Sequence, residues 1–251
     1  MSKQYIFGLH SVAALLTNHP ERIIRLCVQR ERRDKKIENL ISSAKQNHVS
    51  IEYVSQQELD SLTSAANHQG IVAFCSASKT YHEGDIKHLL ENITHAPLIL
   101  VLDGIQDPHN LGACFRSADA AGVDLIIAPK DKSAGITPVV SKVASGAAEI
   151  VPFVQVTNLV RTMEELKELG IWIYGAAGDA MQSLYQTDLS GPAAIVLGAE
   201  GSGLRRLTRE HCDVLVKIPM QGSVSSLNVS VATGVFLFEV LRQRTKDASI
   251  V

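Results

Sequence analysis

The sequence predicts an α/β protein in which parallel strands are covered by helices, organised as two domains. Short apolar runs alternate with amphipathic segments along most of the 251 residues, which is the pattern of α/β units. Runs such as "LILVL" and "AAIVL" are continuously apolar, as expected for strands buried on both faces of a parallel sheet. Residues 76–96 are more polar and show no strand pattern. They predict a linker with one short helix, between a domain over residues 1–75 and a domain over residues 97–251.

The first domain is expected to be a small α/β unit. Its strands are predicted from short apolar, β-branched runs at residues 22–29, 49–55 and 70–76. Its helices are predicted from apolar residues three and four positions apart, at residues 8–18, 35–48 and 56–65.

The second domain repeats the alternation over a longer stretch. Strands are predicted at residues 98–104, 123–129, 151–156, 171–177, 193–199 and 214–220. Helices are predicted at residues 110–122, 137–149, 158–170, 203–212 and 227–244.

The composition excludes several classes of protein. No apolar run is long enough to cross a bilayer, and "MSKQYIFGLH" lacks the charged head and apolar core of a signal peptide, so a cytoplasmic protein is expected. The cysteines are separated by 48, 39 and 98 residues, which fits neither a zinc site nor a disulfide framework. We expect reduced, mostly buried thiols. The nine histidines lack metal-binding spacings, so no metal is expected.

The stretch "IVLGAEGSGL", residues 195–204, has the strand, glycine loop and basic segment of a nucleotide site. Its glycines read G-x-x-G-x-G, however, the reverse of the dinucleotide fingerprint, and they lie near the C-terminus instead of at the first βα turn. A dinucleotide oxidoreductase is therefore the weakest interpretation.

Three polar or glycine-rich loops follow strands of the second domain, at residues 105–122, 198–204 and 221–234. Because parallel strands end at one edge of a sheet, these loops should meet there. Asn110 is expected to cap the helix that carries Arg116, and Ser225 or Ser226 the last helix.

Capping leaves three polar residues of these loops unexplained. Arg116 and Asn228 lie in predicted helices among small and apolar residues, and Glu200 lies inside the glycine loop. Polar groups in such surroundings are costly without partners. Converging polar groups at strand ends therefore predict a binding site.

The stretches "DGIQDPHNLGACFRSADAAG", "IVLGAEGSGL" and "IPMQGSVSSLNVSVA" resemble, in order and distance, the three motifs of the SpoU branch of the SPOUT RNA methyltransferases. The N-terminal part, with "YIFGLHSVAALL" and "HQGIVA", is similar to the substrate-binding module of ribosomal RNA members. The resemblance implies a ribosomal-protein-like RNA-binding domain and a parallel-sheet SPOUT domain with a deep trefoil knot. It further implies an S-adenosylmethionine donor, the ribose 2′-hydroxyl of a guanosine in 23S rRNA as acceptor, and a homodimer.

The resemblance also assigns site residues. The catalytic set comprises Asn110, Arg116, Glu200, Ser226 and Asn228. The cofactor-binding set comprises Gly198, Gly203, Ile218, Met220 and Leu227. Here Gly198 is expected to let the backbone approach the ligand closely, and Gly201 and Gly203 to supply turn flexibility.

Arg116 matches the residue that the family uses to activate the 2′-hydroxyl. Since a guanidinium normally stays protonated, we favour the hypothesis that Arg116 binds the neighbouring phosphate and stabilises the developing alkoxide. The sequence does not decide between this role and that of a base.

Residues 21–36 hold seven Lys/Arg against three acids in a chain of net charge −2. Charge alone favours a solvated surface, but an RNA substrate makes these residues candidates for contact with rRNA. The predicted RNA-binding residues are Arg22, Arg25, Arg30, Arg32 and Arg33, and the cluster also holds Lys35 and Lys36.

Two other functions stay open. The protein could methylate tRNA or another rRNA site, or it could be a noncatalytic RNA-binding protein on the same scaffold. The N-terminal module favours 23S rRNA, and the presence of all five polar residues favours catalysis.

Overall fold

The computed structural model describes residues 4–32, 34–76 and 81–245. It divides into two compact units. The N-terminal unit comprises Met1–Lys79 and Ile136–Ile150, and the C-terminal unit comprises Thr80–Gly135 and Val151–Val251. The chain therefore returns once to the N-terminal unit, which the order of the predicted elements does not indicate.

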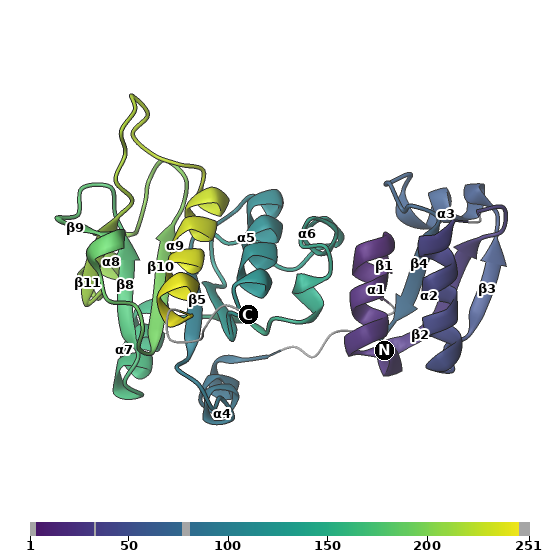
Figure 1. Cartoon of the computed structure of the whole chain (residues 1–251), viewed down its shortest axis with the longest axis horizontal. Helices are drawn as coiled ribbons and strands as arrows, with labels where there is room; N and C mark the ends of the chain where they lie inside the picture. Colours follow the sequence, from purple (N-terminus) through teal and green to yellow (C-terminus); the bar gives the residue numbers. More distant parts are fainter. Residues whose placement is uncertain (1–3, 33, 77–80, 246–251) are drawn as a thin grey trace. The chain divides into compact units, whose positions relative to one another are not determined.

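The N-terminal unit has a four-stranded mixed sheet with helices on both faces (Figure 1). Its strands are β1 (Gln4–Phe7), β2 (Ile23–Gln29), β3 (Ile51–Val54) and β4 (Ile71–Cys75), in the order β1-β4-β2-β3. Strand β4 is antiparallel to β1 and β2, whereas β2 and β3 are parallel. The three predicted strands are confirmed, and β1 was not predicted.

Helices α1 (Leu9–Asn18) and α2 (Lys35–Gln46) share the main core of this unit, and α3 (Gln56–Thr63) packs on the opposite face. All three confirm the predicted helices. Asp34 caps α2, and Ser55 with Glu58 forms a capping box on α3. A 3-10 turn (Pro20–Arg22) precedes β2.

The returning segment completes this unit. The helix predicted at residues 137–149 is broken into α6 (Pro138–Val143) and a 3-10 turn (Ala147–Glu149), because Ser145 and Gly146 both have positive φ. A Cβ on Gly146 would lie 2.4 Å from the Cβ of Ala14 in α1, so only glycine permits this close approach.

The C-terminal unit contains a parallel sheet, as predicted, and this sheet has seven strands. The strand order is β7-β6-β5-β10-β8-β11-β9. The strands are β5 (Leu98–Asp103), β6 (Leu125–Pro129), β7 (Phe153–Val156), β8 (Trp172–Ala176), β9 (Gln182–Ser183), β10 (Ala193–Gly198) and β11 (Val214–Lys217). The six predicted strands are confirmed, and the two-residue β9 was not predicted.

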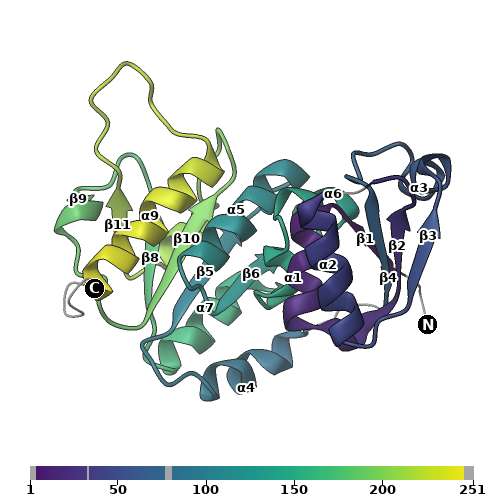
Figure 2. The same ribbon diagram turned by 45° about the vertical axis from the view of Figure 1, so that its right-hand side comes forward.

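Helices cover both faces of this sheet. Figures 1 and 2 show α5 (Pro108–Ala120) and α9 (Val229–Arg244) side by side on one face. On the other face, α4 (Ile86–Glu91) and α7 (Leu159–Glu168) share an apolar cluster with β5, β6 and β7, and α8 (Arg206–Glu210) contacts α7. Short 3-10 turns occur at Glu83–Asp85 and Leu184–Gln186.

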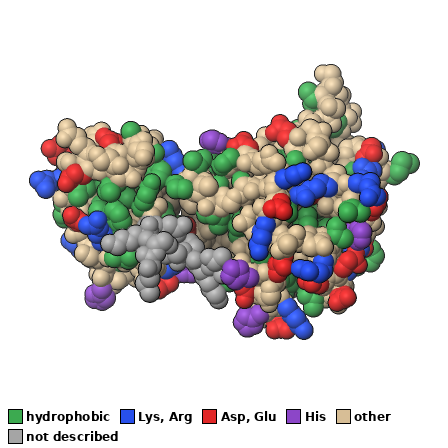
Figure 3. Space-filling view, turned by 180° about the vertical axis from the view of Figure 1, so that it is seen from behind, with side chains coloured by type: hydrophobic (Ala, Val, Ile, Leu, Met, Phe, Trp, Pro, Cys, Tyr) green, Lys and Arg blue, Asp and Glu red, His purple; other side chains and the backbone are tan. Residues whose placement is uncertain are grey.

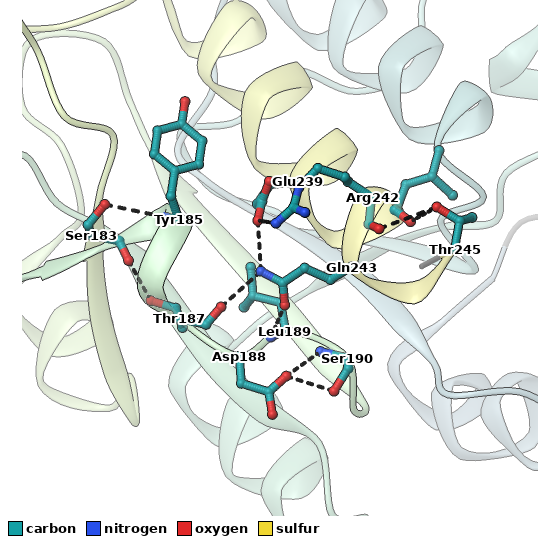
Figure 4. Close-up of polar contacts among 11 residues, drawn as sticks. Ser183, Tyr185, Thr187, Asp188, Leu189, Ser190, Glu239, Arg242, Gln243 and Thr245 are labelled. Carbon is teal, nitrogen blue, oxygen red and sulfur yellow. Dashed lines mark hydrogen bonds and ion pairs between the residues drawn. The ribbon is translucent and has the colours of Figure 1, made fainter. Parts of the chain in front are cut away.

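The C-terminal end of α9 is anchored by polar contacts (Figure 4). Gln243 donates to the Thr187 carbonyl at 2.9 Å and accepts from the Leu189 amide at 2.8 Å. Arg244 donates to the carbonyls of Ala96, Pro97 and Gly191, which lie one or two residues before the starts of β5 and β10. This end of α9 therefore lies where the strands begin, and its first residues lie where the strands end.

None of the helices in the described residues combines the length and the apolar composition that a membrane crossing requires.

Candidate active site

A cavity of about 410 Å³ lies at the carboxyl ends of the parallel strands. Its walls come from the ends of β8, β10 and β11, from the loops that follow them, and from the first turns of α9. The loop between β11 and α9 extends beyond the sheet in Figures 1 and 2. Residues 218–228 of this loop include no Asp, Glu, Lys or Arg, and its projecting tip in Figure 3 shows neither red nor blue.

The cavity brings together most of the residues predicted for the site. All five predicted cofactor-binding residues line it, together with Glu200 and Ser226 from the predicted catalytic set. These predicted cofactor-binding residues are Gly198, Gly203, Ile218, Met220 and Leu227. Two sequence-distant loops therefore form one wall, as the rule for parallel strand ends predicts.

The glycine loop folds back on its own strand. The Gly203 amide donates to the Ala199 carbonyl at 2.9 Å, and Gly201 and Gly203 have φ of +80° and +66°. A Cβ on Gly198 would lie 2.0 Å from the Gly203 carbonyl carbon. Gly198 therefore makes room for the returning chain itself, and its close approach to the ligand stays a prediction.

Asn110 and Asn228 meet directly. The side-chain amide of Asn228 donates to the side-chain oxygen of Asn110 at 3.0 Å. The capping predictions were wrong for both helices. Asp107 caps α5, because its carboxylate accepts from the His109 amide at 2.9 Å, and Asn228 caps α9 by accepting from the Ser230 amide.

The structure changes the interpretation of two polar residues. Asn228 precedes α9, so capping explains its side-chain oxygen, and its bond to Asn110 explains its amide. Arg116 lies on the exposed side of α5, so its charge stays solvated and carries no burial penalty. Its guanidinium makes no hydrogen bond or ion pair to another described residue, which leaves it available to a ligand.

One wall of the cavity consists of residues that were not predicted from the sequence. Ala176, Ala177 and Gly178, at the end of β8, line it beside Lys217. A glycine follows this apolar strand, as glycines follow β10, and this could have indicated a second ligand-binding turn. No family motif covers this turn, so it was not predicted.

No cysteine of the described residues lines the cavity. The described residues contain no group of His, Cys, Asp and Glu that could hold a metal ion. All four cysteines are free, and all but the half-buried Cys212 are fully buried, which confirms the prediction. Burial raises the pKa of Cys114 to about 11, and its sulfur lies 3.3 Å from the Thr233 hydroxyl between α5 and α9.

The predicted RNA-binding arginines have different surroundings in the N-terminal unit. Arg22 is largely buried and forms an ion pair of 2.6 Å with Glu149, which makes it a poor candidate for RNA contact. Arg25 pairs with Glu52 and lies over the ring of Phe74.

The remaining members of the basic cluster lie around the start of α2. Arg32 pairs with Asp34, whereas Arg30, Lys35 and Lys36 are exposed. Arg33 lies outside the described residues.

Both the N-terminal and the C-terminal parts of the chain match families of known proteins. A family model described as the SpoU rRNA Methylase family matches residues 97–238. A second model, described as RNA 2′-O ribose methyltransferase substrate binding, matches residues 5–81.

The relatives are similar over nearly their whole length. The 23S rRNA (guanosine-2′-O-)-methyltransferase RlmB of Shewanella oneidensis is 59% identical, over 97% of this chain and 99% of the relative. RlmB of Pseudomonas putida is 55% identical, over 95% of this chain and 96% of the relative.

Among solved structures, the SpoU methyltransferase AviRb from Streptomyces viridochromogenes, in complex with AdoMet, matches with a TM-score of 0.77. It is 22% identical, and the match covers 96% of this chain and 90% of that chain, so it supports the fold. On the extent of the family match and the identity to its relatives, the chain belongs to the SpoU rRNA methylase family.

Proposed function

We infer that this protein transfers a methyl group from S-adenosylmethionine to the ribose 2′-hydroxyl of a guanosine in 23S rRNA. The identity of 55–59% to two RlmB proteins over nearly the whole chain carries this inference. The cavity supports it, because it lies where parallel sheets bind ligands and is lined by seven of the ten residues that the family motifs assign.

The cavity fits the cofactor in size and in the chemistry of its walls. Its volume of about 410 Å³ lies within the roughly 300–1,000 Å³ of small-molecule sites. Backbone groups of Gly198 and Gly203 and the side chains of Ile218, Met220 and Leu227 would hold the adenosine. When bound, S-adenosylmethionine supplies an electrophilic methyl group on a sulfonium.

The polar residues would prepare the acceptor. Arg116, exposed and without a protein partner among the described residues, binds the phosphate next to the target ribose and stabilises the negative charge on the 2′-oxygen as its proton passes to water. Asn110 and Asn228 hold each other in place at the start of α5 and α9. Glu200 and Ser226, on the cavity wall, orient the ribose and the cofactor by hydrogen bonding.

The N-terminal part would recognise the RNA. The match of residues 5–81 to a substrate-binding model supports a recognition domain over residues 1–75. A linker at 76–96 would join it to a catalytic domain over 97–251, of which Ile136–Ile150 packs with the N-terminal unit. Its basic cluster supplies affinity for phosphates, which is independent of RNA sequence.

The family resemblance further supports a homodimer, a deep trefoil knot in the catalytic domain and a location in the cytoplasm, where rRNA is modified. On α9, Val231 and Phe238 are about half exposed and lie seven residues apart on one face. This stripe is suited to a helix contact with a second copy.

The decisive experiment is methyl transfer from labelled S-adenosylmethionine to 23S rRNA, followed by mapping of the product. We expect one guanosine to carry a 2′-O-methyl group. Label on tRNA alone would favour the alternative substrate, and RNA binding without methyl transfer would favour a noncatalytic protein.

A further inference from the structure

Asp103 is the last residue of β5, and its side chain is completely buried at the carboxyl edge of the sheet. One carboxylate oxygen accepts from the main-chain amide of Arg205 at 2.9 Å. The other lies 2.8 Å from Nε of the same residue. In the described part of the chain, Arg205 supplies every hydrogen bond and ion pair of this carboxylate.

Arg205 occupies a particular place in the chain. It follows the glycine loop directly and precedes α8, for which its own side chain provides no cap. Gly104, which follows Asp103, has a φ of +86°, and a Cβ there would lie 3.4 Å from the Arg205 guanidinium. At that distance a Cβ would make an ordinary van der Waals contact, so the positive φ, and not a lack of space, favours glycine at this turn.

These contacts hold the glycine loop at both ends. At its entry, Gly198 packs against the backbone of Gly203. At its exit, Arg205 is held by Asp103. Asp103 also lies opposite Gly198 in the pairing of β5 with β10. The contacts at the entry and at the exit of the loop are therefore made by neighbouring residues of the sheet.

The same aspartate begins the turn that leads to the acceptor side of the site. The chain runs from Asp103 through Gly104 to Asp107, which caps α5, and on to Asn110. Removal of the partner of a buried carboxylate leaves an unpaired charge in the interior. The free-energy cost of that charge is much larger than the stabilisation that an exposed ion pair provides. The contact therefore ties the loop that carries Glu200 to the segment that carries Asn110.

We propose that Asp103 and Arg205 are a positioning pair for methyl transfer, which fixes the cofactor loop relative to Asn110 and Arg116. The proposal rests on the proposed function, because it assigns the two sides of the pair to the methyl donor and the acceptor. Neither residue touches the reacting atoms. Their effect is on alignment, to which reaction rates are very sensitive.

The test compares the pair with a neighbouring ion pair of similar length. Arg206 pairs with Glu210 at 2.8 Å on the exposed surface of α8, so Arg206→Ala is the matched control. The test variants are Asp103→Asn, Arg205→Ala, Arg205→Lys and the double variant Asp103→Asn with Arg205→Ala. Asp103→Asn keeps an acceptor for the Arg205 amide and removes the buried charge, so it carries the test if Arg205→Ala does not fold.

Two quantities are measured in the full-length protein. Calorimetry gives the affinity for S-adenosylmethionine without RNA. Single-turnover assays at saturating cofactor and RNA give the rate of methyl transfer, at a temperature well below unfolding. A purely structural pair would change the unfolding temperature and leave this rate unchanged in the folded protein.

We expect Asp103→Asn and Arg205→Ala to lower the single-turnover rate about tenfold or more relative to Arg206→Ala. Arg205→Lys should recover part of the rate, and the double variant should be no slower than Arg205→Ala, because both residues act through one contact. Rates within about twofold of the control, or rate effects that add in the double variant, would overturn the proposal. Absence of methyl transfer in the wild-type protein would instead refute the proposed function, and cofactor affinity would still report on the loop.

Discussion

The side-chain amide of Asn228 donates a hydrogen bond of 3.0 Å to the side-chain oxygen of Asn110, across 118 positions of the sequence. The side-chain oxygen of Asn228 caps α9, because it accepts from the main-chain amide and the hydroxyl of Ser230. One side chain thus begins the last helix and joins it to the first turn of α5. Replacements that separate the two roles can show which of them activity requires.

Asn228→Asp should separate these roles. The carboxylate still accepts from the Ser230 amide and suits a helix N-terminus, so we expect the free energy of unfolding to change by less than about 1 kcal/mol. It cannot donate to Asn110, so methyl transfer should fall about tenfold or more. Thermal unfolding and single-turnover assays measure the two effects. Asn110→Ala, which removes the same bond without touching a cap, should reduce the rate by a similar factor, and full activity in both variants would contradict the role.

Gly198→Ala tests the packing of the glycine loop. Because the new Cβ would lie 2.0 Å from the backbone of Gly203, a single methyl group suffices to displace the loop. We expect calorimetry to show loss of S-adenosylmethionine binding. The control is Gly222→Ala in the following loop, where no atom lies within 4 Å of the new Cβ. Normal binding by Gly198→Ala would show that the cofactor does not depend on this loop.

Arg116→Ala should separate chemistry from cofactor binding. Since Arg116 is exposed and makes no hydrogen bond or ion pair with the described residues, its removal should leave stability and cofactor affinity nearly unchanged. Methyl transfer should fall by roughly 100-fold or more, as for removal of a group that stabilises transition-state charge. Arg116→Lys should recover little, because a point charge does not reproduce a planar fork. Near-normal turnover in the alanine variant would exclude Arg116 from the reaction.

Much of this architecture could be predicted from local patterns in the sequence. Apolar runs located the six longer strands of the parallel sheet, and the polar ends of β10 and β11 indicated the cavity that their loops line. What failed depends on contacts between distant segments. The rule for parallel strand ends brings the loops of Asn110 and Asn228 together, but it does not show that these two side chains bond. The break at Gly146 reflects the approach of Ala14. The Asp103–Arg205 contact escaped for the same reason, since it joins positions 102 residues apart.

The thiols should make stability depend on alkaline pH. Burial raises the pKa of Cys75 and Cys114 to about 11 and that of Cys212 to about 12, from an ordinary value of 9.0. A raised pKa in the folded state means that the neutral thiol is favoured there. This contribution is therefore complete below pH 9 and is lost as the pH rises toward 11 and 12.

Unfolding free energies measured between pH 8 and pH 11 should show this decline. At pH 8, a thiol reagent should react slowly with the native protein. After denaturation it should react rapidly with all four cysteines. Rapid reaction of a native thiol would contradict the assigned burial.

A test of whether the basic cluster binds RNA requires the full chain. Because Ile136–Ile150 packs within the N-terminal unit, a fragment that begins near residue 90 would expose Ala147 and Ala148, which are buried in the intact protein. Substitutions are therefore a cleaner test than truncation.

Lys35→Ala with Lys36→Ala removes two exposed cations at the start of α2 and should leave folding unchanged. If both lysines bind phosphates, the slope of log affinity for rRNA against log salt should fall by about 1 for each phosphate that is no longer bound. Arg22→Ala should act differently, because it breaks a buried pair with Glu149 and should destabilise the fold by roughly 3–5 kcal/mol. Binding titrations at several salt concentrations, paired with urea unfolding, distinguish the two effects. An unchanged salt slope in the lysine variant would mean that these two lysines do not touch RNA and serve only as surface charge.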